Sequence, residues 1–240
     1  MADQHRSVTT PDGAMDVYEA RPDGDAKGAV IVIQEAFGVN EHIRDVTRRL
    51  AAAGYHAAAP ALFHRAGGGA IDDYDNVDFN EMMKLFEGVQ DDAVLSDVDA
   101  TVDLLRGEGF ADSRIGIVGF CFGGRVTFLV SARRALGAGV TFYGGGIVTA
   151  GHFQFPTLID EAGSLRTPWL GLFGDEDGGI PVEDVERLRA AVAAAPVDTE
   201  VVRYPGAGHG FHCDVRSAYH EPSARDGWAR ALAWFDHHLG

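Results

Sequence analysis

Apolar runs alternate with amphipathic segments along most of this chain. Residues 28–33 form a continuous apolar run, which is typical of a strand covered on both faces, and residues 43–53 follow with the apolar spacing of a helix. The same alternation continues with strands at 56–60, 114–118, 139–143, 168–173 and 199–204, and helices at 91–106, 123–133, 182–194 and 223–239. This order predicts an α/β fold in which a mostly parallel, doubly wound sheet carries helices on both faces.

Two segments interrupt the alternation. Residues 15–18 alternate apolar and polar side chains after a Pro-Asp-Gly turn, which predicts an edge strand paired with residues 7–9. Residues 61–90 contain three consecutive glycines, several aspartates including Asp75, and a short apolar helix around 82–86. We expect this stretch to be a cap-like excursion that covers a pocket. The sequence shows no repeat or linker, so we predict one domain over residues 1–240.

Composition narrows the functional classes. A chain of 240 residues that is 46% hydrophobic can bury one substantial core. Its formal net charge of −16 repels polyanions, which argues against nucleic acid and anionic membrane surfaces as partners. The sequence begins without a signal-peptide pattern and contains no apolar run long enough for a spanning helix. We therefore expect a cytoplasmic monomer or small homo-oligomer that acts on a small molecule.

The segment Gly119-Phe120-Cys121-Phe122-Gly123-Gly124 lies between a predicted strand and a predicted helix. It matches the nucleophile elbow, Gly-x-nucleophile-x-Gly, with cysteine where serine is usual. The central residue of such a turn is strained and needs small neighbours. Because it lies beside a helix N-terminus, the helix dipole favours thiolate over thiol. The pattern predicts that Cys121 is a nucleophile.

Two other interpretations of this segment are weaker. A lone cysteine is more often a small buried hydrophobic residue, but the context of strand, elbow and helix favours a nucleophile. A phosphate-binding loop would continue after Gly124 with Lys and then Ser or Thr, whereas the chain has Arg125 and Val126.

Candidates for an acid and a base follow in the order that hydrolases of this kind use, nucleophile, acid, histidine. Asp175 and Asp177 lie in the loop after the predicted strand at 168–173, where a carboxylate can orient an imidazole. His209 lies in a glycine-flanked loop after the last strand, and His212 is close enough to line the same pocket. Both aspartates remain candidates on this evidence.

The loop after the first apolar strand, residues 34–40, offers backbone N–H groups for an oxyanion hole. We predict that the amides of Ala36 and Phe122 form it. Glu35 is either a solvated loop residue or a buried acid near the thiol. Five residues are candidate pocket walls, although single aromatic residues more often belong to a core: Phe37, Phe63, Phe86, Tyr143 and His212.

Together these motifs resemble the dienelactone hydrolase family. The resemblance extends from about residue 29 to the final helix and rests on Gln34-Glu35-Ala36-Phe37-Gly38-Val39-Asn40, Gly119-Phe120-Cys121-Phe122-Gly123-Gly124, Gly174-x-x-Asp177 and Ala207-Gly208-His209-Gly210-Phe211. It implies an α/β-hydrolase fold and a triad of Cys121, His209 and Asp177, and so selects Asp177 over Asp175. It also implies that Glu35 contacts the resting thiol and helps to ionise it when substrate binds.

The resemblance implies hydrolysis of a small carboxylic ester or lactone through a thioester intermediate. We expect neither a cofactor nor a metal, since Asp214 and His212 lack a recognised ligand spacing. Two alternatives stay open: a thioesterase or acyltransferase that uses the same triad, and a non-catalytic small-molecule-binding protein that retains the fold.

The chain departs from the family at the residues that hold a substrate carboxylate. The lactone for which the family is named carries a carboxylate that arginines bind, one of them four residues after the catalytic histidine. That position is Cys213 here, and an arginine is also absent from the few residues before Lys84. Anionic substrates are therefore in doubt unless another arginine takes this role, the candidates being Arg65, Arg125 and Arg216.

Overall fold

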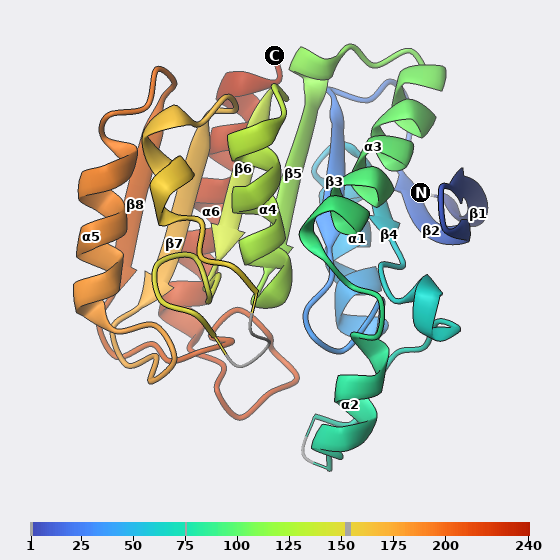
Figure 1. Cartoon of the computed structure of the whole chain (residues 1–240). Coiled ribbons are helices and arrows are strands. Elements are labelled where there is room, and N and C mark those ends of the chain that lie inside the picture. The colour runs from blue at the N-terminus through green and yellow to red at the C-terminus, as the bar shows by residue number, and fades with distance from the viewer. Residues whose placement is uncertain (1, 75, 152–154) are drawn as a thin grey trace.

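A computed structural model describes residues 2–74, 76–151 and 155–240; Asp75, one of the predicted cap acids, lies outside these ranges. One eight-stranded sheet has the strand order β1-β2-β4-β3-β5-β6-β7-β8 (Figure 1). The strands are β1 (Ala2–Thr10), β2 (Gly13–Arg21), β3 (Ala29–Ile33), β4 (His56–Pro60), β5 (Ile115–Phe120), β6 (Ala138–Phe142), β7 (Trp169–Gly174) and β8 (Thr199–Tyr204). The helices are α1 (Glu41–Ala52), α2 (Phe79–Leu85), α3 (Asp91–Gly107), α4 (Phe122–Arg133), α5 (Val182–Val192) and α6 (Glu221–His238), with short 3₁₀ turns at His64–Ala66, Asp112–Arg114 and Ile159–Ser164.

The sheet is parallel from β4 to β8, while β1 and β2 form an antiparallel hairpin at one edge. Helices α3, α4 and α5 cover one face, and α1 and α6 cover the other (Figure 1). Every residue of β3, β5, β6 and β7 is buried, which explains why these strands read as continuous apolar runs. The predicted fold class is confirmed.

The excursion at 61–90 extends past the carboxyl ends of the strands (Figure 1). Helix α2 begins three residues before the predicted apolar helix because the side chain of Asp78 accepts hydrogen bonds from the Asn80 and Glu81 amides. Phe63 and Phe86 pack against each other with ring centroids 4.9 Å apart, and Phe86 lies 5.1 Å from Phe122. The excursion therefore packs against the start of α4.

The elbow between β5 and α4 forces a residue with a side chain into positive φ. Cys121 has φ 54° and ψ −116°, and its amide donates to the Phe142 carbonyl at 3.1 Å. A Cβ on Gly119 would lie 1.9 Å from the Gly123 carbonyl oxygen, and one on Gly123 would lie 2.5 Å from that of Gln34. Glycine is required at both positions because backbone occupies the space of a side chain.

We expect Gly119→Ala to lower the free energy of unfolding by about 3 kcal/mol, because its methyl group would overlap backbone that cannot move independently. Gly107→Ala at the end of α3 is the matched control, since its Cβ would meet no heavy atom within 4 Å. The control should leave stability unchanged or raise it by up to about 1 kcal/mol. Urea unfolding followed by circular dichroism measures both. Equal stability of the two variants would contradict the packing argument.

Candidate active site

Three parallel strands bring the predicted catalytic side chains to one edge of the sheet. Cys121 directly follows β5, Asp177 lies in the loop after β7, and His209 lies in the loop after β8. Because the carboxyl ends of parallel strands meet at the same edge, residues 56 and 32 positions apart in the sequence come together.

His209 and Asp177 form a direct pair. The Nδ1 atom of His209 lies 2.7 Å from Oδ2 of Asp177, while Oδ1 of Asp177 accepts from the Gly179 amide at 2.9 Å. The Asp177 side chain is 1% exposed, and that of His209 is 33% exposed. Each carboxylate oxygen of Asp177 therefore has a partner, and part of the His209 imidazole remains accessible to solvent.

The neighbouring carboxylate is engaged elsewhere. Asp175 accepts two hydrogen bonds from Arg203, at 2.7 and 2.9 Å. Of the two aspartates that the loop sequence offered, the geometry therefore pairs Asp177 with the imidazole.

Electrostatics favour the protonated form of His209. Burial opposes its charge, but the nearby Cys121 sulfur and the Asp177 carboxylate outweigh burial, partly through hydrogen bonds, and raise the pKa of His209 well above its usual value. An imidazolium next to Cys121 is suited to stabilise a thiolate.

A cavity of about 300 Å³ opens over these groups. Its walls are Cys121, Phe122, Arg125, Gly145, Gly146, Gly151, Phe155, Asp177, Gly178, Gly179, Ile180 and His209. The cavity brings a thiol, an imidazole and a carboxylate together with apolar walls, which suits a small organic substrate.

Comparisons with known proteins show the family of this chain. The sequence profile of the dienelactone hydrolase family matches residues 15–239. The chain belongs to the dienelactone hydrolase family. This confirms the resemblance and the prediction of a hydrolase.

Relatives cover almost the whole chain. A provisionally named carboxymethylenebutenolidase of Methylorubrum extorquens is 42% identical over 231 residues, covering 95% of this chain and 78% of the relative. A provisionally named carboxymethylenebutenolidase of Escherichia coli is 42% identical over 242 residues, which cover 98% of this chain and 86% of the relative. The crystal structure of a provisionally identified dienelactone hydrolase from Klebsiella pneumoniae has a TM-score of 0.85 at 40% identity, covering 98% of this chain and 99% of that one.

The two predicted oxyanion donors come from different segments of the chain. Phe122 begins α4 and lines the cavity beside Cys121, whereas Ala36 is buried in the loop after β3. Their role as an oxyanion hole stays a prediction.

Within the described ranges, no helix has both the length and the apolar character needed to cross a membrane.

The five predicted wall residues do not line the cavity over Cys121. Tyr143 is fully buried with its ring 5.2 Å from that of His209, and His212 packs against Phe120 at 5.2 Å. Phe63 and Phe86 support Phe122, and Phe37 packs edge-on against Tyr74 at 4.9 Å. Neither these five residues nor any other described residue of the 61–90 excursion lines the cavity over Cys121. Direct substrate contact by them stays a prediction.

The walls that the sequence did not indicate come from loops. Phe155, Ile180 and the glycines at 145, 146 and 151 line the cavity between β6 and α5. The short-range signal that could have indicated them is the run of glycines directly after β6, since bare backbone near a strand end leaves room for a ligand.

Of the three candidate arginines, only Arg125 lines this cavity. Its guanidinium donates to both oxygens of Asp91, at 2.6 and 3.1 Å, and to the Pro156 carbonyl at 2.6 Å. Arg65 pairs with Asp97 and Asp12 instead. The charge of Arg125 is therefore already compensated.

Glu35 is fully buried, which removes the solvated-loop interpretation. Its Oε2 lies 3.4 Å from the Tyr74 hydroxyl, and its Oε1 lies 3.6 Å from Nη1 of Arg216. Neither contact involves Cys121. Glu35 also lies beside Cys213, where burial and the charge of this carboxylate raise the pKa of the thiol to about 12. Cys213 thus occupies the position of a family arginine as a neutral thiol.

Proposed function

We propose that this protein hydrolyses small, uncharged carboxylic esters or lactones, with Cys121 as nucleophile, His209 as general base and Asp177 as the residue that orients it. The observation that carries the proposal is that Cys121 stands at a strained elbow in the same cavity as a histidine held 2.7 Å from a buried carboxylate. Names of relatives that refer to carboxymethylenebutenolidase support the reaction class.

The reaction follows from these positions. The thiolate of Cys121 attacks the substrate carbonyl, and the amides of Ala36 and Phe122 stabilise the oxyanion, each by about 3 to 4 kcal/mol. Protonated His209 then gives its proton to the departing alkoxide, which leaves a thioester on Cys121. His209 next takes a proton from water as the water attacks the thioester, and the acid product leaves.

A panel of purified substrates tests the proposal. Neutral lactones and short esters should be hydrolysed with a higher specificity constant than matched thioesters. A preference for the thioester would favour the thioesterase alternative, and no turnover of any member would favour a binding protein that retains the fold.

We expect the enzyme to prefer neutral over anionic substrates by roughly tenfold at low salt, because the net charge is −16 and Asp91 neutralises the one arginine of the cavity wall. Specificity constants for a matched ester pair, one carrying a carboxylate, measure this at several ionic strengths. Salt should narrow the difference.

Asp91→Asn should free the guanidinium of Arg125 and raise the relative specificity for the anion by roughly tenfold, equivalent to about 1.4 kcal/mol. Asp92→Asn is the matched control because it removes the same charge from the same helix turn, where the side chain is 97% exposed. Equal responses of the two variants would show that only overall charge matters.

We further propose that Glu35 controls ionisation of Cys121 when substrate binds. A buried carboxylate close to the active-site elbow opposes a second negative charge, and Arg216 and Tyr74 hold it in the resting protein. Movement of Glu35 toward the thiol would let it accept the proton.

Glu35→Gln should therefore lower turnover by roughly a hundredfold, the range of one acid–base group. It should also let the thiol ionise at lower pH without substrate. Ionisation of Cys121 is measured in chelator-treated protein, as the ultraviolet absorbance of the thiolate against pH. Cys121→Ala serves as the blank. Superimposable titrations of wild type and Glu35→Gln would rule out the controlling role.

A further inference from the structure

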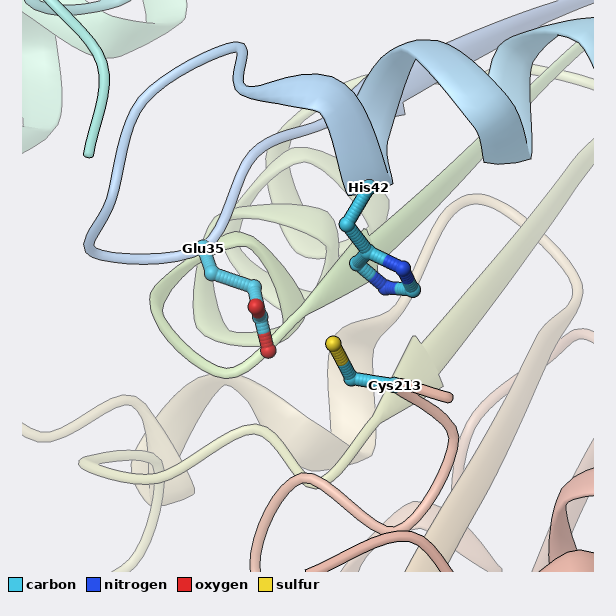
Figure 2. Close-up of side chains that lie close together, drawn as sticks. All are labelled: Glu35, His42 and Cys213. Carbon is cyan, nitrogen blue, oxygen red and sulfur yellow. The ribbon is translucent and has the colours of Figure 1, made fainter. Parts of the chain in front are cut away.

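Three potential ligand side chains converge behind the active site. Glu35 comes from the loop after β3, His42 from the first turn of α1, and Cys213 from the loop after β8, and their side chains point toward one another (Figure 2). One ligand atom from each lies within 4.8 Å of the other two. All three residues are buried, with exposed fractions of 0, 4 and 0%.

This cluster contains buried polar atoms that make no hydrogen bond within the described part of the chain. Among the described residues, Oε1 of Glu35 and both ring nitrogens of His42 have no hydrogen-bond partner. The closest charged groups are Arg216, 3.6 Å from that oxygen, and Asp214, 4.0 Å from Nδ1 of His42. Buried polar atoms normally have a hydrogen-bond partner, so three such atoms in one cluster indicate a missing ligand.

We propose that Glu35, His42 and Cys213 bind a thiophilic divalent cation, with zinc as the best fit. Thiolate, imidazole and carboxylate are the ligands that zinc prefers. Bond lengths of about 2.0 to 2.3 Å on a tetrahedron place ligand atoms about 3.4 to 3.7 Å apart. Since the ligand atoms lie within 4.8 Å of one another, binding requires them to approach by up to roughly 1 Å, and the fourth position stays open.

One of the three proposed ligands, His42, also borders a cavity other than the one over Cys121. This cavity has a volume of about 380 Å³, and its other walls are Tyr74, Val215 and six charged residues: Glu41, Asp45, Arg48, Arg49, Asp72 and Asp214. Four of these are acids, and the two arginines pair with Glu41, Asp45 and Asp214. It shares no wall residue with the cavity over Cys121.

Binding of the cation removes the thiol proton of Cys213 and forms one sulfur–metal bond. The neutral thiol of Cys213 loses its proton to solvent as the sulfur–metal bond forms, while His42 and Glu35 donate lone pairs. Uptake should therefore release protons and strengthen at higher pH. The sequence predicted no metal because Asp214 and His212, the candidates near His209, lack a recognised ligand spacing. Glu35, His42 and Cys213 lie in three separate segments.

Cobalt titration of chelator-treated protein tests the site. We expect one Co²⁺ per chain, with a thiolate-to-cobalt absorption band that Zn²⁺ abolishes by displacement. Cys213→Ser should lose the band, and His42→Phe, which keeps a ring in place, should raise the Kd by roughly a hundredfold or more. If the serine variant does not fold, the phenylalanine variant gives the affinity result independently.

Two controls separate this cluster from other ligands. Cys121→Ala should keep the band, which excludes the active-site thiol as its source. His237→Gln should also keep it, since Asp198, His237 and His238 form a second cluster that is more exposed. The absence of a band in wild type, its persistence in Cys213→Ser or its loss in Cys121→Ala would overturn the proposal. The readout is metal binding, so it is independent of the hydrolase activity proposed above.

Discussion

Replacing Cys121 with alanine is expected to abolish hydrolysis while the protein stays folded. The elbow is fixed by Gly119 and Gly123, and alanine is smaller than cysteine, so the strained turn remains. Without the sulfur no thioester forms. Because the nucleophile and its base act together, loss of the nucleophile should lower kcat by roughly 10⁴-fold or more. Hydrolysis of the best neutral ester, with circular dichroism as a check on folding, gives the result.

Cys213→Ala is the matched control for this experiment. It removes the second of the two free thiols, which is buried outside the cavity over Cys121. Measured in chelator-treated protein, it should retain most of the activity. Substantial turnover by folded Cys121→Ala, or equal losses in both variants, would contradict Cys121 as the nucleophile.

The sheet could be predicted from the sequence because burial imposes a simple pattern on it. Strands β3, β5, β6 and β7 are covered on both faces and must be apolar throughout. Strand β1 is different, since it lies at the edge and alternates exposed with half-buried residues. Only its last part was therefore predicted, although the strand spans Ala2–Thr10.

The three proposed catalytic side chains could be placed at one edge of the sheet for a related reason. Cys121, Asp177 and His209 each follow a strand within a few residues, so local sequence places them at the sheet edge. Phe155 and Ile180 line the cavity through loop conformations that local sequence does not determine. The meeting of Glu35, His42 and Cys213 likewise depends on how three separate segments pack. The sequence singled out Glu35 and Cys213 for other reasons and gave no indication of His42.

Asp177→Asn should lower kcat/KM by roughly 10³- to 10⁴-fold, because it reverses the hydrogen bond that sets the imidazole tautomer. In wild type, Oδ1 of Asp177 accepts from the Gly179 amide and Oδ2 faces Nδ1 of His209. An asparagine that keeps its oxygen on Gly179 presents its NH₂ group to Nδ1. The imidazole must then carry its proton on Nε2, so that nitrogen can no longer accept a proton.

The pH dependence of this variant separates orientation from simple loss of structure. Cys121 and Asp177 together overcome burial to hold the pKa of His209 well above its usual value. Removing the Asp177 charge should therefore lower the pKa of His209. The part of the pH profile of kcat/KM that depends on ionisation of His209 should move to lower pH. Asp175→Asn is the matched control, because it removes the same charge two residues away, from a carboxylate bound to Arg203. It should change kcat/KM by no more than about twofold and leave the pH dependence of kcat/KM unshifted. If both asparagine variants lose activity equally with unshifted profiles, Asp177 acts only in the fold of its loop and the proposed triad is wrong.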